Sequence, residues 1–467
     1  MRWTQLVTPL KTESATTKAT LAAVSANQTI MAPSSMGVVL SRRWVSVGVM
    51  SAAQREFDIV LYGATGFVGK LTAEYLARAG GDARIALAGR SQDKLRAVRD
   101  TLGEKAQSWP LLATDASQPS TLDAMAAQTQ VVVTAVGPYL KYGLPLVAAC
   151  AAAGTDYADL TGEALFIRES IDLYHKQAID TGARIVHSCG FDSIPSDLTV
   201  FALYRRAIED DAGQLTDTNM VVRAFAGGVS GGTVASMIEL LRTASSDPEA
   251  RRLMNDPYTL TPDRGAEPEL GAQRDVRWRR GREIAPELNG YWMGAFVMAA
   301  ANTRIVRRSN ALLDYAYGKR FEYAEQMSLG KSILAPLAAA MATGGNAATM
   351  ALGGRYFNRL PNKLVERIAP KPGTGPSERA REQGRYAVET YTTTTTGARY
   401  RSTMSQKGDP GYKATSVLLG ESGLALALDR DRLSELRGVL TPAAAMGDAL
   451  MARFPAAGVS LETARLN

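Results

Sequence analysis

The feature that most constrains this chain is a glycine-rich turn set between an apolar strand and a helix. Residues 57–62 form a short apolar run, and a helical pattern over residues 67–79 follows it directly. Between them, residues 63–69 carry the spacing G-x-x-G-x-x-G. Glycine lets the backbone approach a ligand closely, and a helix N-terminus offers free N–H groups to an anion. The pattern predicts a dinucleotide-binding turn; a structural turn in another α/β protein is the alternative.

The same rhythm of strand and helix continues to about residue 200. Further strands are expected at residues 84–88, 109–113, 131–135, 156–160 and 184–188, and helices between them include 144–153 and 163–181. The β-branched run at 131–135 is typical of a buried central strand. This βαβ alternation predicts an α/β fold with a Rossmann-type, doubly wound parallel sheet.

After about residue 215 the rhythm changes. A strand at 219–226, a helix at 233–243 and a Thr-rich hairpin at 386–405 indicate a second, α+β domain. The expected organisation is a disordered leader or mis-called start at 1–55, an NADP-binding Rossmann domain at 56–215, an α+β substrate or dimerisation domain at 216–410, and a C-terminal helical segment at 411–467 that packs back on the core.

The residues after the second predicted strand indicate which dinucleotide binds. A chain that binds NAD places an acid there for the ribose hydroxyls. This sequence instead has Arg90 and Ser91, with Lys94 one turn later. An arginine can stack on adenine and pair with a 2′-phosphate, so NADP is the expected cofactor; a solvated strand end is the alternative for Arg90. Asp115, just past the third strand, is expected to lie by the adenine or to cap a helix.

The remaining cofactor contacts are expected from two loops. We expect the pyrophosphate to contact Gly63, Thr65, Gly66, Phe67, Val68 and Gly69. The loop after the fourth strand passes near the nicotinamide in this fold, where Gly137 and Pro138 would permit a close backbone approach. Tyr139 would then project toward the substrate, or pack as a buried aromatic.

Polar residues follow the fifth and sixth predicted strands, at the edge where doubly wound sheets bind ligands. Tyr157, Asp159 and Glu163 form the first group, and Asp192 belongs to the second. We expect the three carboxylates to converge on one crevice. A carboxylate there can orient a substrate, or donate a proton if burial raises its pKa. Helix capping is the structural alternative.

Charge and composition narrow the class of partner. Four of the seven net positive charges lie in residues 1–50, so the body is nearly balanced and does not predict a nucleic-acid binder. The two cysteines and two histidines form no metal-binding pattern, and no metal is expected. A reducing compartment fits this cysteine usage, which predicts a cytoplasmic protein. Residues 1–50 loosely resemble a transit peptide; alternatively, translation starts further along the sequence, near Met50. In either case we expect these residues to be poorly ordered.

Two further segments allow more than one interpretation. Residues 332–354 carry no charge, and Gly344-Gly345-Asn346 interrupts them, so we expect two short apolar helices around a turn. They would serve the core or a homodimer interface, contact a lipid or membrane surface, or span a membrane. The basic run at residues 277–282 would grip an anionic partner such as a carrier protein, or form a solvated loop.

Taken together, these motifs resemble the saccharopine dehydrogenase-like oxidoreductases. The matching segments are residues 63–69, 88–90, 136–139, 157–163, 190–197, 371–378 and 438–443. Several of them are not general Rossmann features, and the resemblance covers residues 57–463. Within that family the chain is most similar to the actinobacterial trans-acting enoyl reductases.

The resemblance implies an NADPH-dependent reduction of a carbon–carbon double bond in a polyketide or lipid acyl chain on an acyl carrier protein. Hydride would go to the β-carbon and a proton to the α-carbon. Tyr139 or Tyr157 would be the proton donor or the partner of the thioester carbonyl, and Asp159 and Asp192 would orient the substrate. Reduction of another small substrate, an imine or ketone, is the alternative, as is a non-catalytic lipid-surface protein that retains the nucleotide fold.

Overall fold

The computed structural model describes residues 55–227, 231–262, 270, 273–277, 279–349, 354–357 and 375–467. These residues belong to one compact unit that contains two sheets. The expected leader, apart from Arg55, lies outside the described residues, and so do parts of the apolar segment and of the motif at residues 371–378.

The first sheet is parallel and has seven described strands in the order β12-β6-β5-β4-β1-β2-β3. Its strands are β1 (Phe57–Tyr62), β2 (Ile85–Gly89), β3 (Leu111–Ala113), β4 (Thr129–Thr134), β5 (Asp156–Ala158), β6 (Arg184–Val186) and β12 (Gly438–Leu440). The chain order reverses direction between β1 and β4, which is the switch point at which doubly wound sheets bind ligands. The predicted α/β Rossmann-type fold is therefore confirmed.

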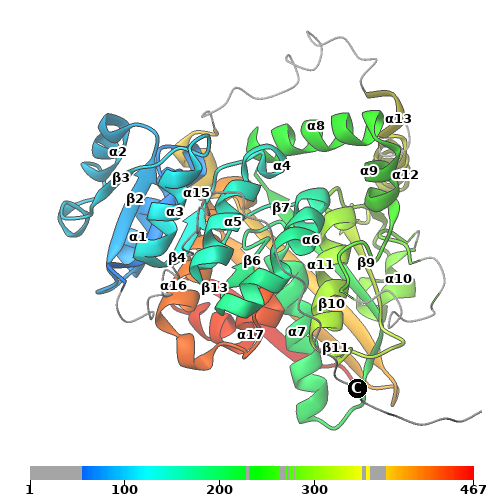
Figure 1. The fold of residues 1–467 in the computed structure, drawn as a ribbon. Helices are drawn as coiled ribbons and strands as arrows, with labels where there is room; N and C mark the ends of the chain where they lie inside the picture. The colour runs from blue at the N-terminus through cyan, green and yellow to red at the C-terminus, as the bar shows by residue number, and fades with distance from the viewer. Residues whose placement is uncertain are drawn as a thin grey trace, which may run out of the picture. The chain divides into compact units, whose positions relative to one another are not determined.

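Helices cover both faces of this sheet (Figure 1). The flanking elements are α1 (Phe67–Ala79), α2 (Gln92–Arg99), η2 (Glu104–Ala106), α3 (Pro119–Gln128), α4 (Tyr139–Tyr142), α5 (Leu144–Ala153), α6 (Ala164–Thr181), α7 (Ile194–Glu209), α16 (Thr415–Leu428), η8 (Arg430–Arg432) and α17 (Pro442–Arg453). Strand β1 shows how the two cores form, because its side chains alternate between faces. Ile59 and Leu61 belong to the core that includes α1 and α16, whereas Val60 and Tyr62 belong to the core that includes α3 and α5.

The second sheet is mixed and has six described strands in the order β13-β11-β10-β7-β9-β8. Its strands are β7 (Leu215–Ala226), β8 (Met293–Ala295), β9 (Glu322–Ser328), β10 (Arg385–Thr394), β11 (Arg399–Lys407) and β13 (Val459–Arg465). The helices of this half are α8 (Gly231–Ser246), α9 (Pro248–Asn255), α10 (Gly281–Ile284), η4 (Pro286–Leu288), α11 (Ala299–Leu312), α12 (Ala335–Ala348), α13 (Gly354–Tyr356), α15 (Glu378–Gln383) and η7 (Pro410–Ala414). The predicted hairpin is present as β10 and β11.

The C-terminal segment at 411–467, predicted to be helical, contains the helices α16 and α17 but also two strands. Strand β12 joins the edge of the first sheet beside β6, and β13 joins the edge of the second sheet beside β11. Strand β12 has only three residues, and the pairing partners of both strands lie far away in the sequence. The local pattern therefore carries little signal for them.

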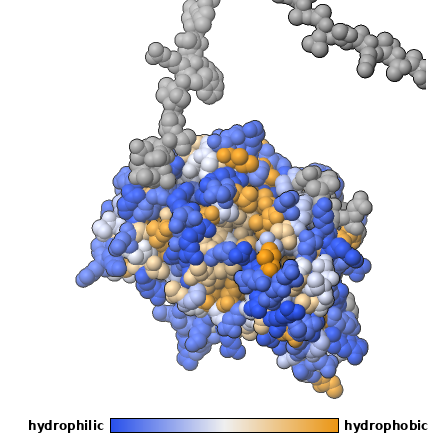
Figure 2. Space-filling view, turned by 90° about the horizontal axis from the view of Figure 1, so that it is seen from below, coloured by the Kyte–Doolittle hydropathy of each residue, from blue (hydrophilic) through white to orange (hydrophobic). Residues whose placement is uncertain are grey.

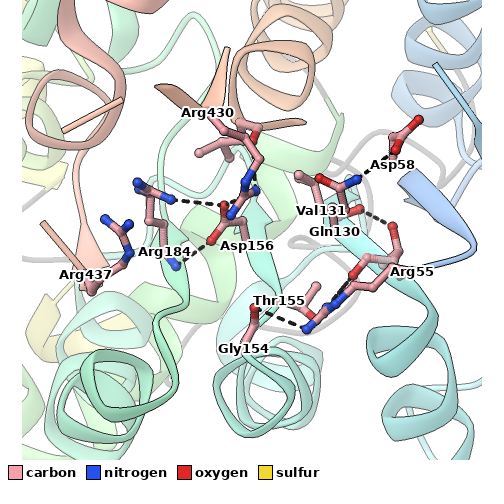
Figure 3. A network of polar contacts seen from close by, with 12 residues as sticks. Arg55, Asp58, Gln130, Val131, Gly154, Thr155, Asp156, Arg184, Arg430 and Arg437 are labelled. Carbon is pink, nitrogen blue, oxygen red and sulfur yellow. Dashed lines mark hydrogen bonds and ion pairs between the residues drawn. The ribbon is translucent and has the colours of Figure 1, made fainter. Parts of the chain in front are cut away.

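A network of polar contacts ties the C-terminal segment to the first sheet at the amino ends of β5 and β6 (Figure 3). The buried Asp156 carboxylate accepts a hydrogen bond from the Arg184 backbone N–H at 2.8 Å and pairs with Arg430 Nη1 at 2.9 Å. Nearby, the Arg55 guanidinium donates to the Thr155 hydroxyl and to the Ala126 carbonyl. These contacts lie at the opposite end of the strands from the glycine turn, so we assign them to stability.

Within the apolar segment at 332–354, helix α12 continues without a break from Ala335 to Ala348, where a turn was predicted at Gly344-Gly345-Asn346. Helix α12 runs through Gly344 and Gly345, because the alanine-rich flanks favour helix enough to offset the glycines. No helix of the described residues is long and apolar enough to cross a membrane. Several large apolar side chains of this segment point to solvent, with Ile333 94% exposed and Met341 69% exposed. On the face shown in Figure 2, hydrophobic residues gather around a hollowed centre and hydrophilic residues lie at its rim.

Candidate functional site

A cavity of about 290 Å³ lies at the carboxyl ends of the first sheet's strands. One wall comes from the first sheet: the start of α1, the loop after β4 and the loop after β5. The other wall comes from α8, from Met298 and from η7 with Thr415. The site therefore forms between the nucleotide-binding half and the second half of the chain.

The glycine turn is shaped to hold a phosphate. Gly63 has φ +86°, a conformation that favours glycine. A Cβ at Gly69 would lie 2.1 Å from the Gly63 carbonyl oxygen, so only glycine permits this close packing of helix on strand. Helix α1 begins after Gly66 with no side-chain cap and no acid in its first turn. Its first N–H groups and dipole are therefore available to an anion, and the residues fit a dinucleotide pyrophosphate.

The predicted adenosine contacts lie at the ends of β2 and β3. Arg90 and Lys94 are exposed. Ser91 caps α2, since its hydroxyl accepts the Lys94 backbone N–H at 3.4 Å. Asp115 accepts the Ser117 backbone N–H at 3.0 Å, and this bond holds the pKa of Asp115 below its usual range. Asp115 thus caps a turn, while the two cations remain exposed for a 2′-phosphate.

Tyr139 forms part of the cavity wall together with Gly137 and Pro138. Its hydroxyl donates to the Thr134 carbonyl at 3.2 Å and accepts the Leu160 backbone N–H at 3.4 Å. Burial raises the pKa of Tyr139 well above its ordinary value. The tyrosine therefore links the loop after β4 to the loop after β5.

Glu163 lines the cavity and joins its two walls. Its two carboxylate oxygens accept the backbone N–H groups of Tyr139 and Leu140, both at 2.8 Å. Ser236 on α8 donates a third hydrogen bond to the same carboxylate at 2.5 Å. Since these donors occupy the carboxylate, its contribution is to hold α4 and α8 in place.

Asp192 lines the cavity at the point where the loop after β6 leads into α7. Its side chain is partly exposed, and among the described residues no hydrogen bond or ion pair reaches its carboxylate. Burial raises the pKa of Asp192 to about 6. A carboxyl in this state can carry a proton in a largely apolar cavity.

Tyr157 and Asp159 lie behind the cavity wall, away from the predicted crevice. One Asp159 oxygen accepts the Tyr157 hydroxyl at 2.8 Å and contacts His187 Nδ1 at 2.8 Å. The other accepts the backbone N–H groups of Ser188 at 3.0 Å and Thr161 at 3.1 Å. The carboxylate turns inward because these four groups need an acceptor. Of the three carboxylates expected to converge, Glu163 and Asp192 therefore do so.

Sequence patterns did not predict the cavity wall from the second half. Met237, Leu240 and Met298 supply apolar surface, and Tyr412 and Thr415 supply hydroxyl-bearing side chains. Thr415 accepts the Phe191 backbone N–H at 2.7 Å, which fixes the residue next to Asp192. None of these residues belongs to a chemical motif, so only tertiary packing identifies them.

Three arginines of the basic run at 277–282 are engaged within the chain. Arg277 pairs with Asp217 at 2.5 Å and also with Glu322, and Arg279 pairs with Asp217 at 2.6 Å. Arg280 packs over the Trp292 ring. This part of the run therefore stabilises the second half and leaves few cations for an anionic partner.

The sequence is similar to proteins of known family over most of its length. Residues 59–186 match the saccharopine dehydrogenase NADP binding domain. A Mycobacterium tuberculosis protein named as a candidate trans-acting enoyl reductase is 72% identical over 417 residues, which are 89% of this chain and 100% of its own. The trans-acting enoyl reductase of Mycobacterium bovis is 68% identical over 419 residues, 90% of this chain and 100% of its own.

Among solved structures, the apo saccharopine dehydrogenase (L-Glu forming) of Saccharomyces cerevisiae covers 88% of this chain and 99% of its own at 13% identity, with a TM-score of 0.47. The domain match confirms the expected cofactor, NADP. The identity to the mycobacterial proteins confirms the family that the motifs indicated. The chain therefore belongs to the family of the trans-acting enoyl reductases, whose nucleotide-binding domain is of the saccharopine dehydrogenase type.

Proposed function

We propose that this chain is an NADPH-dependent trans-acting enoyl reductase, which reduces a carbon–carbon double bond in a lipid or polyketide acyl chain carried by a partner synthase. The observation that carries the proposal is the cavity itself. It joins the phosphate-binding turn to an apolar wall and contains two acids, Glu163 and Asp192, and no described residue engages the carboxylate of Asp192. Relatives with 66–72% identity carry this enzyme name.

The proposed roles follow from these contacts. Bound NADPH supplies the hydride for the β-carbon. The glycine turn and the N-terminus of α1 hold the pyrophosphate, and Arg90 and Lys94 hold the 2′-phosphate. Asp192 holds a proton at its carboxyl oxygen and donates it to the α-carbon, because burial keeps part of the population protonated near neutral pH.

The other predicted catalytic residues act in this proposal as positioning residues. Tyr139 fixes the loop beside the nicotinamide site through its bonds to Thr134 and Leu160. Tyr157 and Asp159 hold the ends of β5 and β6 together behind that loop. Their substitution would move the wall on which the acyl chain rests.

The cavity wall favours an acyl substrate over an amino acid. Leu160, Met237, Leu240 and Met298 provide apolar surface, and no cation lines the cavity among the described residues. The carboxylates of a saccharopine-like substrate would need cationic partners there. We therefore propose the second half, residues 216–410, as the part that binds the acyl chain.

We also propose that the apolar face at the start of α12 contacts a lipid surface. Ile333, Leu334, Leu337 and Met341 are between 61% and 94% exposed, and such a face is stabilised when it leaves water. The double variant Ile333→Asp/Leu337→Asp should lower flotation with liposomes and keep NADPH binding. If the variant instead turns a homodimer into a monomer with flotation unchanged, the face is a dimer interface.

A substrate panel tests the proposed reaction. We expect NADPH to be oxidised with enoyl-thioesters on an acyl carrier and not with pairs of amino acid and keto acid. Oxidation with imines or ketones alone would instead make the chain a reductase of another small substrate. A chain that binds no NADPH would be a non-catalytic protein that retains the nucleotide fold.

A further inference from the structure

A segment far from the nucleotide-binding domain in sequence packs against the phosphate-binding turn. Phe67 is the first residue of α1, and its ring contacts the backbone of Gly375. A Cβ at residue 375 would lie 2.4 Å from Phe67 Cζ and 2.6 Å from Cε1, so only glycine permits this approach. The chain continues from this point into α15, which Figure 1 draws close to the helices of the first sheet.

Three groups from the second half surround the Phe67 ring. Gly375 lies on it, the Tyr412 ring meets it edge-on with centroids 4.8 Å apart, and the Arg381 guanidinium lies over it at 5.3 Å from the centroid. Phe67 and Tyr412 also line the cavity. The Arg381 guanidinium is therefore held beside the residue whose backbone begins the phosphate-binding helix.

The buried Asp409 carboxylate feels the charge of Arg381, which opposes the rise in its pKa that burial causes, but Arg381 forms no ion pair within the described part of the chain. Its guanidinium is partly buried, yet no described carboxylate lies within ion-pair distance of it. Its neighbour Lys413, by contrast, pairs with Glu382. One Arg381 nitrogen donates to the Pro376 carbonyl at 2.8 Å, and a guanidinium has five N–H donors in all. Several donors thus remain for an anion.

The first turn of α1, which Phe67 begins, carries no anionic side chain. Helix α1 has neither a capping side chain nor an acid in its first turn, and Lys70, on its second turn, adds positive charge. Phe67 thus brings a positive helix end and a planar arginine fork close together from two halves of the chain. Such a pair suits a diphosphate, which a guanidinium can contact through two parallel hydrogen bonds.

We propose that Arg381 binds the pyrophosphate of NADP from outside the Rossmann domain. The phosphates would then lie between the glycine turn and the segment 375–383, and cofactor binding would stabilise the packing of that segment on Phe67. The proposal rests on the NADP site and not on the enoyl reductase activity.

Binding measurements on the full chain test this role. For Arg381→Ala, we expect the Kd for NADPH, measured by its fluorescence, to rise about 10- to 100-fold, the range for losing charge-assisted hydrogen bonds. Competition with ADP should weaken by the same factor, whereas competition with 2′-AMP should be unchanged. Arg379→Ala is the matched control, because Arg379 is exposed on the same helix, and it should leave all three affinities within about twofold.

The outcomes separate the alternatives. A loss for NADPH and 2′-AMP but not for ADP would overturn the proposal, because Arg381 would then read the 2′-phosphate. Unchanged NADPH binding would overturn it as well and would make Arg381 a packing residue of Phe67. Arg381→Gln keeps much of the stem over the ring and removes the charge. If Arg381→Ala lowers the melting temperature without cofactor, the glutamine variant separates loss of charge from loss of packing. Weaker NADPH binding by Arg381→Gln supports the proposal, and unchanged NADPH binding contradicts it. A wild-type chain that binds no NADPH would contradict the NADP site itself.

Discussion

Replacing Gly69 by alanine should disrupt the phosphate-binding turn. The new Cβ would lie 2.1 Å from the Gly63 carbonyl oxygen, 2.9 Å from the Gly63 carbonyl carbon and 3.0 Å from Ala64 Cα. All three atoms are backbone, so no side chain can rotate away and the turn must move. Overpacking of this kind lowers the free energy of unfolding by about 1–3 kcal/mol. Displacing the turn would also remove the proposed phosphate contacts, and we expect the Kd for NADPH to rise at least about tenfold.

The assay for Gly69→Ala combines urea unfolding with an NADPH fluorescence titration. The matched control is Gly344→Ala in α12, where a Cβ would meet no atom within 4 Å. A glycine-to-alanine change in an exposed helix should raise the free energy of unfolding by about 0.5–1 kcal/mol and leave NADPH binding unchanged. If Gly69→Ala binds NADPH as tightly as the wild type, the glycine turn does not hold the cofactor and the reasoning fails.

Three other substitutions test separate parts of the account. Asp192→Asn should lower kcat about 10²- to 10⁴-fold and leave NADPH binding intact. Because the protonated acid is the donor, kcat/KM of the wild type should fall as pH rises above about 6. A pH profile that is flat through 6 would exclude Asp192 as the donor. Arg90→Ala should weaken NADPH binding about tenfold and leave NADH binding unchanged, as titrations with both will show. Burial raises the pKa of Glu325 to about 7, so the folded protein holds this proton more tightly than the unfolded chain does. The free energy of unfolding therefore falls as pH rises from about 4 to 7. Glu325→Gln should therefore gain stability relative to wild type between pH 5 and pH 8 in urea unfolding, and an unchanged difference would contradict the raised pKa.

Local sequence patterns predicted the nucleotide-binding half closely. Strand β1, helix α1 and helix α5 occupy the predicted residues, because each is a clear apolar or amphipathic run with a glycine or proline boundary. Glycines 63 and 69 could be read from spacing, since a turn of this geometry demands them. Strand β12 could not be predicted from the sequence, because its three residues form a strand only by pairing with β6, about 250 positions earlier.

The candidate site could be predicted only in part, because local patterns locate the ends of strands but not the contacts between distant segments. The strand ends correctly indicated where Glu163 and Asp192 lie, because the carboxyl ends of parallel strands share one edge. The direction of the Asp159 side chain depended on Tyr157, His187 and Ser188, whose spatial proximity no local pattern discloses. The wall from α8 and η7 likewise depends on how the two halves of the chain pack.

We propose that NADPH reduces an enoyl chain in this cavity with a proton from Asp192. The most direct measurement is mass spectrometry of the product formed from an enoyl-thioester with C4-deuterated NADPH, and separately with unlabelled NADPH in D₂O. We expect a saturated product with cofactor deuterium at the β-carbon and solvent deuterium at the α-carbon, formed much more slowly by Asp192→Asn. An enoyl-thioester that remains unsaturated while the chain binds NADPH would contradict this proposal.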